Sequence, residues 1–254
     1  MDAELLNDAH DSWAAWLTAT AEHIEAGGSQ RFGAITAAGT GVPFGLFNQA
    51  FVFTDPDPQD LADAVAWLTG REAPFWVTVP DPLFATVAEH AADLDLTPRE
   101  HSMPGMALTS LDGIPPSPEA VADIAPMQPE HVEDAAAVAS EAFGVPLEYC
   151  RVLIPASVID DDRMRWIVGT VDGEVAGCGQ LVVSGRVAGV YTIAVREAFR
   201  RRGIGELLTW ETLRAGRDLG CEVGVLQASE MGKPIYARMG FEETVRYRML
   251  VPAT

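Results

Sequence analysis

The segment of the sequence with the clearest chemistry runs from Val190 to Leu208. It contains an apolar stretch typical of a strand, three consecutive arginines at 200–202, the pair Gly203 and Gly205, and then a helical pattern. Backbone N–H groups at a helix start are unpaired and carry partial positive charge, so they attract anions. Guanidinium groups suit phosphate oxygens, and glycine lets a ligand approach the main chain closely. The pattern therefore predicts a pyrophosphate-binding turn, in preference to an ordinary exposed run of charge.

The elements around this segment predict an α/β fold in which a sheet is flanked by helices. In the second half of the chain, apolar periodicity predicts strands at 121–125, 164–170, 174–184, 188–195, 222–227 and 245–251. The same patterns predict helices at 129–143, 147–154, 204–219 and 232–239. Asp172-Gly173, between two apolar runs, is a strong β-hairpin signal.

The first half of the chain repeats part of this order. It is predicted to contain a helix around 4–26, strands at 32–38, 46–53, 75–79 and 101–108, and helices at 58–69 and 82–92. The order strand, helix, strand, helix, strand from residue 48 to 108 matches that from 190 to 251, which favours an internal duplication over coincidence. Ser110–Pro118 is the clearest linker. We therefore expect two domains, residues 1–115 and residues 116–254.

The amino-acid composition disfavours some classes of binding partner. A formal net charge of -20 disfavours nucleic acid and anionic membranes. Lys233 is the only lysine, and this acid-rich, lysine-poor usage suggests an acidic proteome adapted to high salt. That hypothesis requires a gain in stability at molar salt. The charge is uneven, because residues 1–115 carry 17 acidic against 3 basic side chains and residues 116–254 carry 20 against 14.

The cysteines and the N-terminus indicate a cytoplasmic protein. Cys150, Cys178 and Cys221 are far apart and show no metal-ligand spacing, so we expect reduced core residues and no metal site. The acidic N-terminal segment lacks the basic and apolar regions of a signal peptide, and no apolar run reaches the length of a membrane span.

The motifs of the second half carry a specific resemblance. The run Arg200-Arg201-Arg202-Gly203-Ile204-Gly205 resembles the acetyl-CoA signature of the GNAT superfamily of N-acetyltransferases, which is Arg or Gln, two residues, Gly, one residue, and Gly or Ala. Tyr236-Ala-Arg-Met-Gly-Phe241 resembles the Tyr-x-x-x-Gly-Phe of that family. The resemblance covers residues 116–254 well. Over residues 1–115 it rests on element order, as in tandem members with a degenerate N-terminal copy. It implies a GNAT-like acyltransferase fold in two tandem domains, the second catalytic.

This resemblance implies roles for individual residues. The strand ending in Ile193-Ala194-Val195 is expected to splay from the strand near Gln227, with acetyl-CoA in the gap. Backbone N–H groups of Ile193 and Val195 bind the pantetheine and polarise the thioester, while the amides from Arg201 to Gly205 and the arginine side chains hold the pyrophosphate. Ser229 contacts the other side of the cofactor, and capping of the next helix is an equally open role for it. Tyr236 is the expected general acid for the departing thiolate, with a packed aromatic as the alternative.

One departure from the family pattern concerns the general base. Many members carry a glutamate where this sequence has Tyr191, and no acid lies between Ala188 and Val195. The base is therefore elsewhere, replaced by a water chain, or absent. Glu148 is a weak candidate, and an exposed surface acid is the favoured interpretation of it.

The resemblance thus implies an enzyme that transfers the acetyl group of acetyl-CoA to a primary amine of a small molecule or peptide and releases coenzyme A. The net charge favours a cationic amine, such as an aminoglycoside-like molecule, a polyamine, an amino acid or a peptide N-terminus. The alternative is a non-catalytic acyl-CoA-binding sensor or scaffold, which Tyr191 favours and Tyr236 disfavours. The sequence determines neither the acceptor nor the oligomeric state, so a homodimer is left open.

Overall fold

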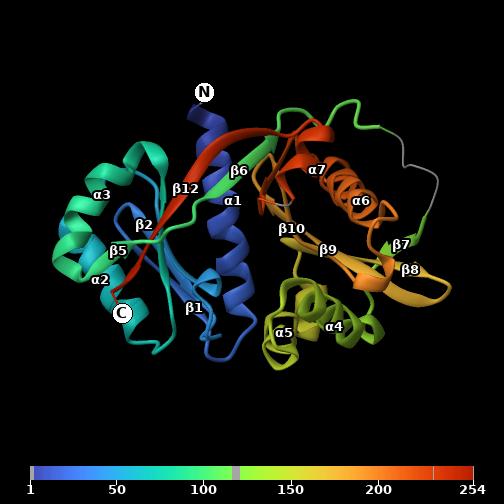
Figure 1. Ribbon diagram of the computed structural model, residues 1–254, viewed down its shortest axis with the longest axis horizontal. Helices are drawn as coiled ribbons and strands as arrows, with labels where there is room; N and C mark the ends of the chain where they lie inside the picture. The colour runs from blue at the N-terminus through green and yellow to red at the C-terminus, as the bar shows by residue number, and fades with distance from the viewer. Residues whose placement is uncertain (1–2, 116–120, 231, 254) are drawn as a thin grey trace. The chain divides into compact units, whose positions relative to one another are not determined.

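The computed structural model describes residues 3–115, 121–230 and 232–253, and the chain divides into two compact units (Figure 1). The first unit comprises Met1–Met106 with Gln227–Thr254, and the second comprises Ala107–Leu226. Each combines a β-sheet with flanking helices, which confirms the predicted mixed α/β class.

The first unit contains most of the N-terminal elements and the C-terminal strand. Its elements are α1 Ala3–Glu22, β1 Gly28–Phe32, β2 Ile35–Gly39, β3 Asn48–Val52, α2 Pro58–Thr69, β4 Trp76–Pro80, α3 Phe84–Ala91, β5 Leu96–Pro98, β6 Met103–Leu108 (which ends in the second unit), α7 Lys233–Arg238 and β12 Glu242–Pro252. The strand order is β1-β2-β3-β4-β12, and β5 also pairs with β12.

Helices cover both faces of this first sheet. On one face, Leu61 and Leu68 of α2 belong to a buried cluster with Val77 and Leu250 of the strands, and α3 lies on the same side (Figure 1). On the other face, Trp13 of α1 packs edge-on against Tyr247 with ring centroids 4.9 Å apart. The alternation of strand side chains therefore supplies an apolar surface to each helical layer.

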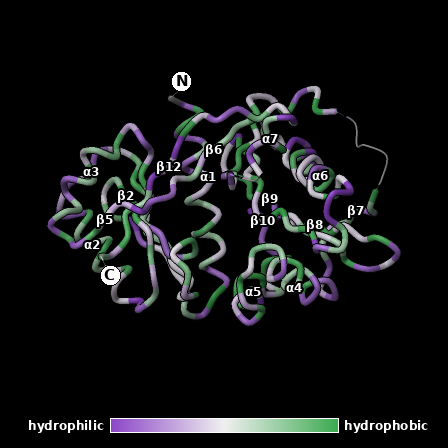
Figure 2. The backbone as a smooth tube through the Cα atoms, in the orientation of Figure 1, coloured by the Kyte–Doolittle hydropathy of each residue, from purple (hydrophilic) through white to green (hydrophobic). Residues whose placement is uncertain are grey.

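The second unit has the strand order β11-β10-β9-β8-β7. Its elements are β7 Asp123–Pro126, α4 Val132–Phe143, α5 Leu147–Leu153, β8 Met164–Val171, β9 Glu174–Ser184, β10 Val187–Val195, α6 Ile204–Asp218 and β11 Val223–Gln227. Strands β10 and β11 are parallel, and the pairs from β10 to β7 are antiparallel. Helix α6 covers one face, with Ile204 and Leu208 buried against Ile167, and α4 with α5 covers the other (Figure 1). In Figure 2 hydrophobic and hydrophilic stretches alternate along α2, α3 and α6, as expected of helices that bury one face.

Many of the predicted elements are confirmed. Helix α2 begins and ends where the sequence pattern places it, at Pro58 and Thr69. The hairpin between β8 and β9 turns at Asp172 and Gly173, whose φ angles of 52° and 82° are those of a type I′ turn. Two short elements differ. The predicted single strand at 32–38 is the turn and second strand of the β1–β2 hairpin, and β5 was not predicted.

The division into two domains at residue 115 does not coincide with the compact units. Residues Tyr247 to Leu250 of β12 pair with Pro80 to Val77 of β4, so the last strand joins the sheet of the first unit. Sequence periodicity identifies a strand but carries no information about which sheet it joins. The predicted linker lies partly outside the described residues. Its described part belongs to the second unit, since the N–H of Leu111 donates to the carbonyl of Glu222 at 2.8 Å.

Candidate functional site

The predicted anion-binding segment forms a turn between β10 and α6, which we call the arginine turn (residues 196–206). A short 3-10 helix at Glu197–Phe199 follows the strand, and α6 begins at Ile204. Arg201 and Gly203 have φ angles of 62° and 83°, both in the left-handed region. Left-handed residues in a turn can direct neighbouring N–H groups toward one side, a geometry that binds anions.

Six consecutive backbone donors of the arginine turn are unpaired. Within the described part of the chain, the N–H groups of residues 201–206 have no acceptor, and the first bond of the helix is Leu207 N–H to the carbonyl of Gly203 at 3.0 Å. Unpaired donors at a helix start carry the positive end of the helix dipole. The turn can therefore bind an anion through several main-chain bonds at once.

The three arginine side chains of the turn are also available for an anion. Arg200 Nε donates to the carbonyl of Val195 at 3.1 Å, and Arg202 Nη2 donates to the carbonyl of Ala198 at 3.3 Å. The Arg202 guanidinium also lies 5.3 Å from the ring centroid of Phe199. All three residues are exposed, and none has an acidic partner among the residues that the structure describes. In a chain with 37 acidic residues, three unneutralised arginines in sequence form a local positive surface.

Helix α4 fixes the beginning of the turn. Asp134 Oδ1 lies 3.3 Å from Arg196 Nη2, and the carboxylate of Glu141 accepts a hydrogen bond from the N–H of Glu197. Arg196 also donates from Nε to the carbonyl of Val175 at 2.8 Å, which ties the turn to β9. The turn is thus held by both the helix layer and the sheet.

Strand β10 separates from β11 before either strand ends. Their parallel pairing covers Val187 to Gly189 opposite Val223 to Val225 and goes no further. Strand β10 continues to Val195, so its last six residues lie beyond this ladder. The splay expected next to Ile193, Ala194 and Val195 is therefore present.

The side chains at the end of β10 divide between the two faces of the sheet. A Cβ placed on Gly205 would lie 3.6 Å from Val195 Cγ2 and 4.0 Å from Ile193 Cγ2, so these two side chains underlie the first turn of α6. Ala194 is buried and pairs with Cys178, whose thiol faces the carbonyl of Ala135 in α4. The predicted cofactor-binding residues from 193 to 205 are thus brought together at one end of the second unit.

The corresponding turn of the first unit is closed by its own side chain. β3, α2 and β4 form a parallel strand–helix–strand crossover, as β10, α6 and β11 do. At the start of α2, however, Asp57 Oδ1 accepts the N–H of Gln59 at 2.8 Å, and no arginine precedes the helix. A carboxylate in this position repels phosphate. The first half is therefore not expected to bind phosphate in the same way.

Ser229 and Tyr236 belong to the first unit. Ser229 Oγ accepts the N–H of Gly232 at 3.0 Å, so its hydroxyl supports the turn that leads into α7. Tyr236 is half-buried in α7 and packs edge-on against Phe241 with ring centroids 5.9 Å apart. Ser229 thus makes a turn contact before α7, whose N-cap residue Gly232 has no side-chain cap bond, and the ring of Tyr236 makes the contact of a packed aromatic.

The two residues discussed for the general base differ in exposure. Tyr191 is buried, with 7% of its surface exposed, and Glu148 is exposed at the start of α5. The described residues contain no group of three or more His, Cys, Asp or Glu that could hold a metal ion. All three cysteines are buried and form no disulfide, and burial raises the pKa of Cys178 to about 12, which disfavours the nucleophilic thiolate.

One polar group was not predicted as a site residue. The side-chain Nε2 of Gln227, at the end of β11, is buried and has no hydrogen-bond partner among the described residues. Buried donors are nearly always paired, so an unpaired one indicates a ligand or ordered water. The sequence signal for it was its place at the strand end, two residues before Ser229.

Within residues 3–115, 121–230 and 232–253, none of the helices has the length and apolar character of a membrane span.

Comparison with known proteins finds one family match and several similar solved structures. Residues 131–241 match the model of the acetyltransferase (GNAT) family, and a search of curated proteins finds no match. Among solved structures, a GCN5-related N-acetyltransferase from Kribbella flavida is 17% identical, with a TM-score of 0.64 over 94% of this chain and 96% of that one. A GCN5-related N-acetyltransferase from Sphaerobacter thermophilus is 20% identical, with a TM-score of 0.58 over 86% and 76%.

A third solved structure bears on the two-unit organisation. A tandem GNAT protein from the clavulanic acid biosynthesis pathway is 16% identical, with a TM-score of 0.58 over 87% of this chain and 79% of that one. At such low identities these likenesses show a shared fold. The family match gives a GNAT acetyltransferase domain at residues 131–241, and the solved structures show that the chain shares their fold.

Proposed function

We propose that the protein is an N-acetyltransferase that transfers the acetyl group of acetyl-CoA to a primary amine of a small molecule or peptide by direct attack. The observation that carries this proposal is the arginine turn, where six unpaired N–H groups lie beside three arginines without acidic partners. A pyrophosphate has the charge and the acceptor oxygens that such a set of donors requires. The family of residues 131–241 supports coenzyme A as the bearer of that pyrophosphate.

In this proposal, acetyl-CoA supplies an activated acetyl group, and the protein supplies binding and electrostatic stabilisation. The amides from Arg201 to Gly205, with the arginine side chains, bind the pyrophosphate. The backbone N–H groups of Ile193 and Val195, at the splayed end of β10, bind the pantetheine and donate to the thioester oxygen. Donors fixed in advance where negative charge develops lower the barrier to acyl transfer.

Tyr236 is proposed as the general acid for the departing thiolate. The unperturbed pKa of tyrosine is about 10 and that of a thiol about 8.5, so the transfer is modestly uphill and requires local tuning. Ser229 is proposed to contact the cofactor from the loop before α7.

In this proposal no carboxylate of β10 acts as the general base, because the strand contains neither Asp nor Glu. Tyr191 is buried at the position where many family members have a glutamate. The acceptor amine therefore arrives neutral or loses its proton through water, and the rate of transfer rises with pH toward the pKa of the amine. The acidic surface favours amines that carry a second positive charge.

The first unit is proposed to be a degenerate copy that does not bind coenzyme A. Its repeated crossover of β3, α2 and β4 supports duplication, and Asp57 at the start of α2 opposes phosphate binding. The three buried cysteines, which form no disulfide, fit the cytoplasmic location expected from the sequence.

A second candidate function is a non-catalytic acyl-CoA sensor or scaffold. It is favoured by Tyr191, which replaces the expected acid and is buried in the sheet. Such a protein binds acetyl-CoA through the same arginine turn and releases no thiol.

One experiment separates these candidates. Acetyl-CoA is incubated with a panel of amines (an aminoglycoside, spermidine, amino acids and a short peptide), and thiol release and the product mass are measured. The enzyme is expected to release thiol and add one acetyl group to an amine. Thermal stabilisation by acetyl-CoA without thiol release for any amine supports the sensor, and no stabilisation at saturating acetyl-CoA contradicts both candidates.

A further inference from the structure

Thr192 in β10 has a backbone conformation that is unfavourable for its residue type. Its φ angle is 51°, in the left-handed region, although β10 is otherwise a strand. A β-branched residue rarely adopts this region, because its Cβ substituents crowd the following carbonyl. Strained residues of this kind persist only where surrounding contacts hold them, and they are often found at functional sites.

The strain belongs to a β-bulge next to the arginine turn. Tyr191 is opposite Gln180 and Ala194 is opposite Cys178, so Thr192 and Ile193 together face the single residue Gly179. Neither bulged residue has a ladder partner on β9, and β11 pairs with β10 only as far as Gly189. The bulge therefore removes the N–H of Ile193, a proposed donor to the thioester, from the regular ladder.

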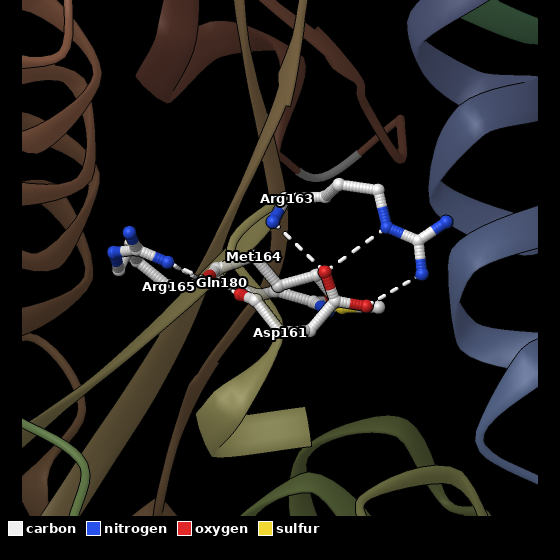
Figure 3. Close-up of polar contacts among 5 residues, drawn as sticks. All are labelled: Asp161, Arg163, Met164, Arg165 and Gln180. Atoms are coloured by element: carbon white, nitrogen blue, oxygen red, sulfur yellow. Dashed lines mark hydrogen bonds and ion pairs between the residues drawn. The ribbon is translucent and has the colours of Figure 1, made fainter. Parts of the chain in front are cut away.

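The buried side chain of Gln180 holds the bulge from β9. Thr192 Oγ1 donates to Gln180 Oε1 at 3.2 Å, and only 1% of Gln180 is exposed. The amide nitrogen of Gln180 contacts Met164 Sδ at 3.1 Å, and Figure 3 draws both residues, which lie on the neighbouring strands β9 and β8. Because the amide is engaged at both ends, its oxygen is fixed toward Thr192.

We propose that Gln180 is a positioning residue for acetyl transfer. By accepting the hydrogen bond from the Thr192 hydroxyl, Gln180 keeps the backbone of Thr192 in the left-handed conformation. The N–H of Ile193 is thereby directed at the oxygen of the bound thioester. The inference rests on the proposed acetyltransferase function. The hydrogen bonds described here join Gln180 to Thr192 and Met164 and not to the arginine turn, so we expect its effect on the chemical step and not on cofactor affinity.

Two substitutions remove the hydrogen bond from opposite ends, and a third retains it. Gln180→Met preserves the volume of the side chain, Thr192→Val preserves the shape of threonine, and Thr192→Ser keeps the hydroxyl. For each variant, kcat and KM for acetyl-CoA are measured by thiol release with the best amine of the panel. The Kd for coenzyme A and the Tm are measured in parallel.

We expect Gln180→Met and Thr192→Val each to lower kcat at least tenfold, with the Kd for coenzyme A changed less than twofold. The double variant is expected to be no slower than the slower single variant, because both changes remove one bond. Thr192→Ser should retain most of kcat. A loss of Tm with unchanged kcat at a permissive temperature would show a purely structural role and overturn the inference.

Thr192→Gly provides a second test, which as a single variant leaves Gln180 in place. Glycine adopts a positive φ without strain, so Thr192→Gly should keep much of kcat. In that background, Gln180→Met should lose its effect, whereas an undiminished effect contradicts the inference.

If the wild-type protein binds acetyl-CoA but releases no thiol, the proposed function fails and the inference fails with it. If the wild-type protein is active and Gln180→Met equals it, only the inference fails.

Discussion

The carboxylate of Glu141, near the end of α4, accepts a hydrogen bond from the backbone N–H of Glu197, the first residue of the short helix after β10. One side chain from a different helix therefore caps the beginning of the arginine turn. Asp134, two helical turns earlier on α4, pairs with Arg196 and reinforces the same attachment. The turn proposed to bind pyrophosphate is thus positioned by a helix that covers the face of the sheet opposite α6.

This attachment gives the first prediction. Glu141→Leu removes the acceptor of the Glu197 N–H, and we expect the Kd for coenzyme A to rise about fivefold, the equivalent of roughly 1 kcal/mol for one hydrogen bond. Glu141→Gln keeps an acceptor oxygen and should bind within twofold of wild type. Isothermal titration calorimetry measures both. Equal affinities for the leucine and glutamine variants would mean that the turn holds its geometry without α4.

The two glycines of the turn should respond to alanine with opposite signs. Gly203 has a φ of 83°, so Gly203→Ala is expected to reduce the free energy of unfolding by about 1–2 kcal/mol. Gly205 lies in the first turn of α6, and a Cβ there would make an ordinary contact with Val195 at 3.6 Å. Gly205→Ala should therefore be neutral or stabilising by up to ~1 kcal/mol, because alanine favours a helix. Urea unfolding monitored by circular dichroism measures both changes, and equal losses would contradict this assignment.

The sequence predicts regular elements better than irregular ones. Helix α2 could be predicted to the residue, because Asp57 and Pro58 mark its start and the apolar spacing is regular. Strand β5 could not be predicted, because three residues ending in Pro98 show no periodicity. The sheet that β12 joins could not be predicted either, since its pairing with β4 depends on residues more than 160 positions away in the chain.

The same limit applies to the candidate site. The arginines and glycines of the turn are visible as types and spacings, so their place between β10 and α6 could be predicted, and anion binding there stays a prediction. The bulge at Thr192 could not, because Val190 to Val195 has the pattern of a regular strand. The residues that contact the bulge lie on another strand: a Cβ on Gly179 would lie 2.8 Å from Ile193 Cδ1, and Gln180 accepts a hydrogen bond from the Thr192 hydroxyl.

A buried histidine makes the stability of the first unit depend on pH. Burial lowers the pKa of His10 from 6.5 to about 3, and its ring packs among Phe53 and Tyr247. The unfolded chain therefore binds this proton at a higher pH than the folded chain does. The free energy of unfolding should fall as pH decreases from about 6.5 toward 3, by roughly 1.4 kcal/mol per pH unit from this residue.

His10→Phe removes this titration while keeping an aromatic ring. Its urea-unfolding free energy should depend less on pH between 4 and 6.5 than that of wild type, and the two curves should be parallel above about pH 7. Parallel curves over the whole range would contradict the assignment of the acid limb to His10.

The arginine side chains should contribute to cofactor affinity through charge. Changing Arg200 and Arg202 together to glutamate is expected to weaken coenzyme A binding at least tenfold, because two positive charges beside the phosphates become negative. The loss should shrink as salt is raised, since exposed charges are screened. Arg217→Glu is the matched control, because Arg217 lies near the other end of α6 and pairs with Asp218. A comparable loss in the control would indicate an effect of net charge and not of the turn.

Tyr236 provides the sharpest test of the proposed chemistry. If its hydroxyl protonates the departing thiolate, Tyr236→Phe should lower kcat about a hundredfold, the scale of general acid catalysis, with little change in the Kd for coenzyme A. The aromatic ring and its edge-on contact with Phe241 at 5.9 Å are retained in this variant, so packing should change little.

Tyr247→Phe, in the core of the same unit, controls for loss of a tyrosine hydroxyl and should keep a kcat near wild type at a temperature where it is folded. Thiol release measured at several pH values distinguishes the roles, because loss of a general acid removes the decrease in rate at high pH. Equal rates for wild type and Tyr236→Phe would mean that solvent protonates the thiolate and that the site acts by binding and oxyanion stabilisation alone.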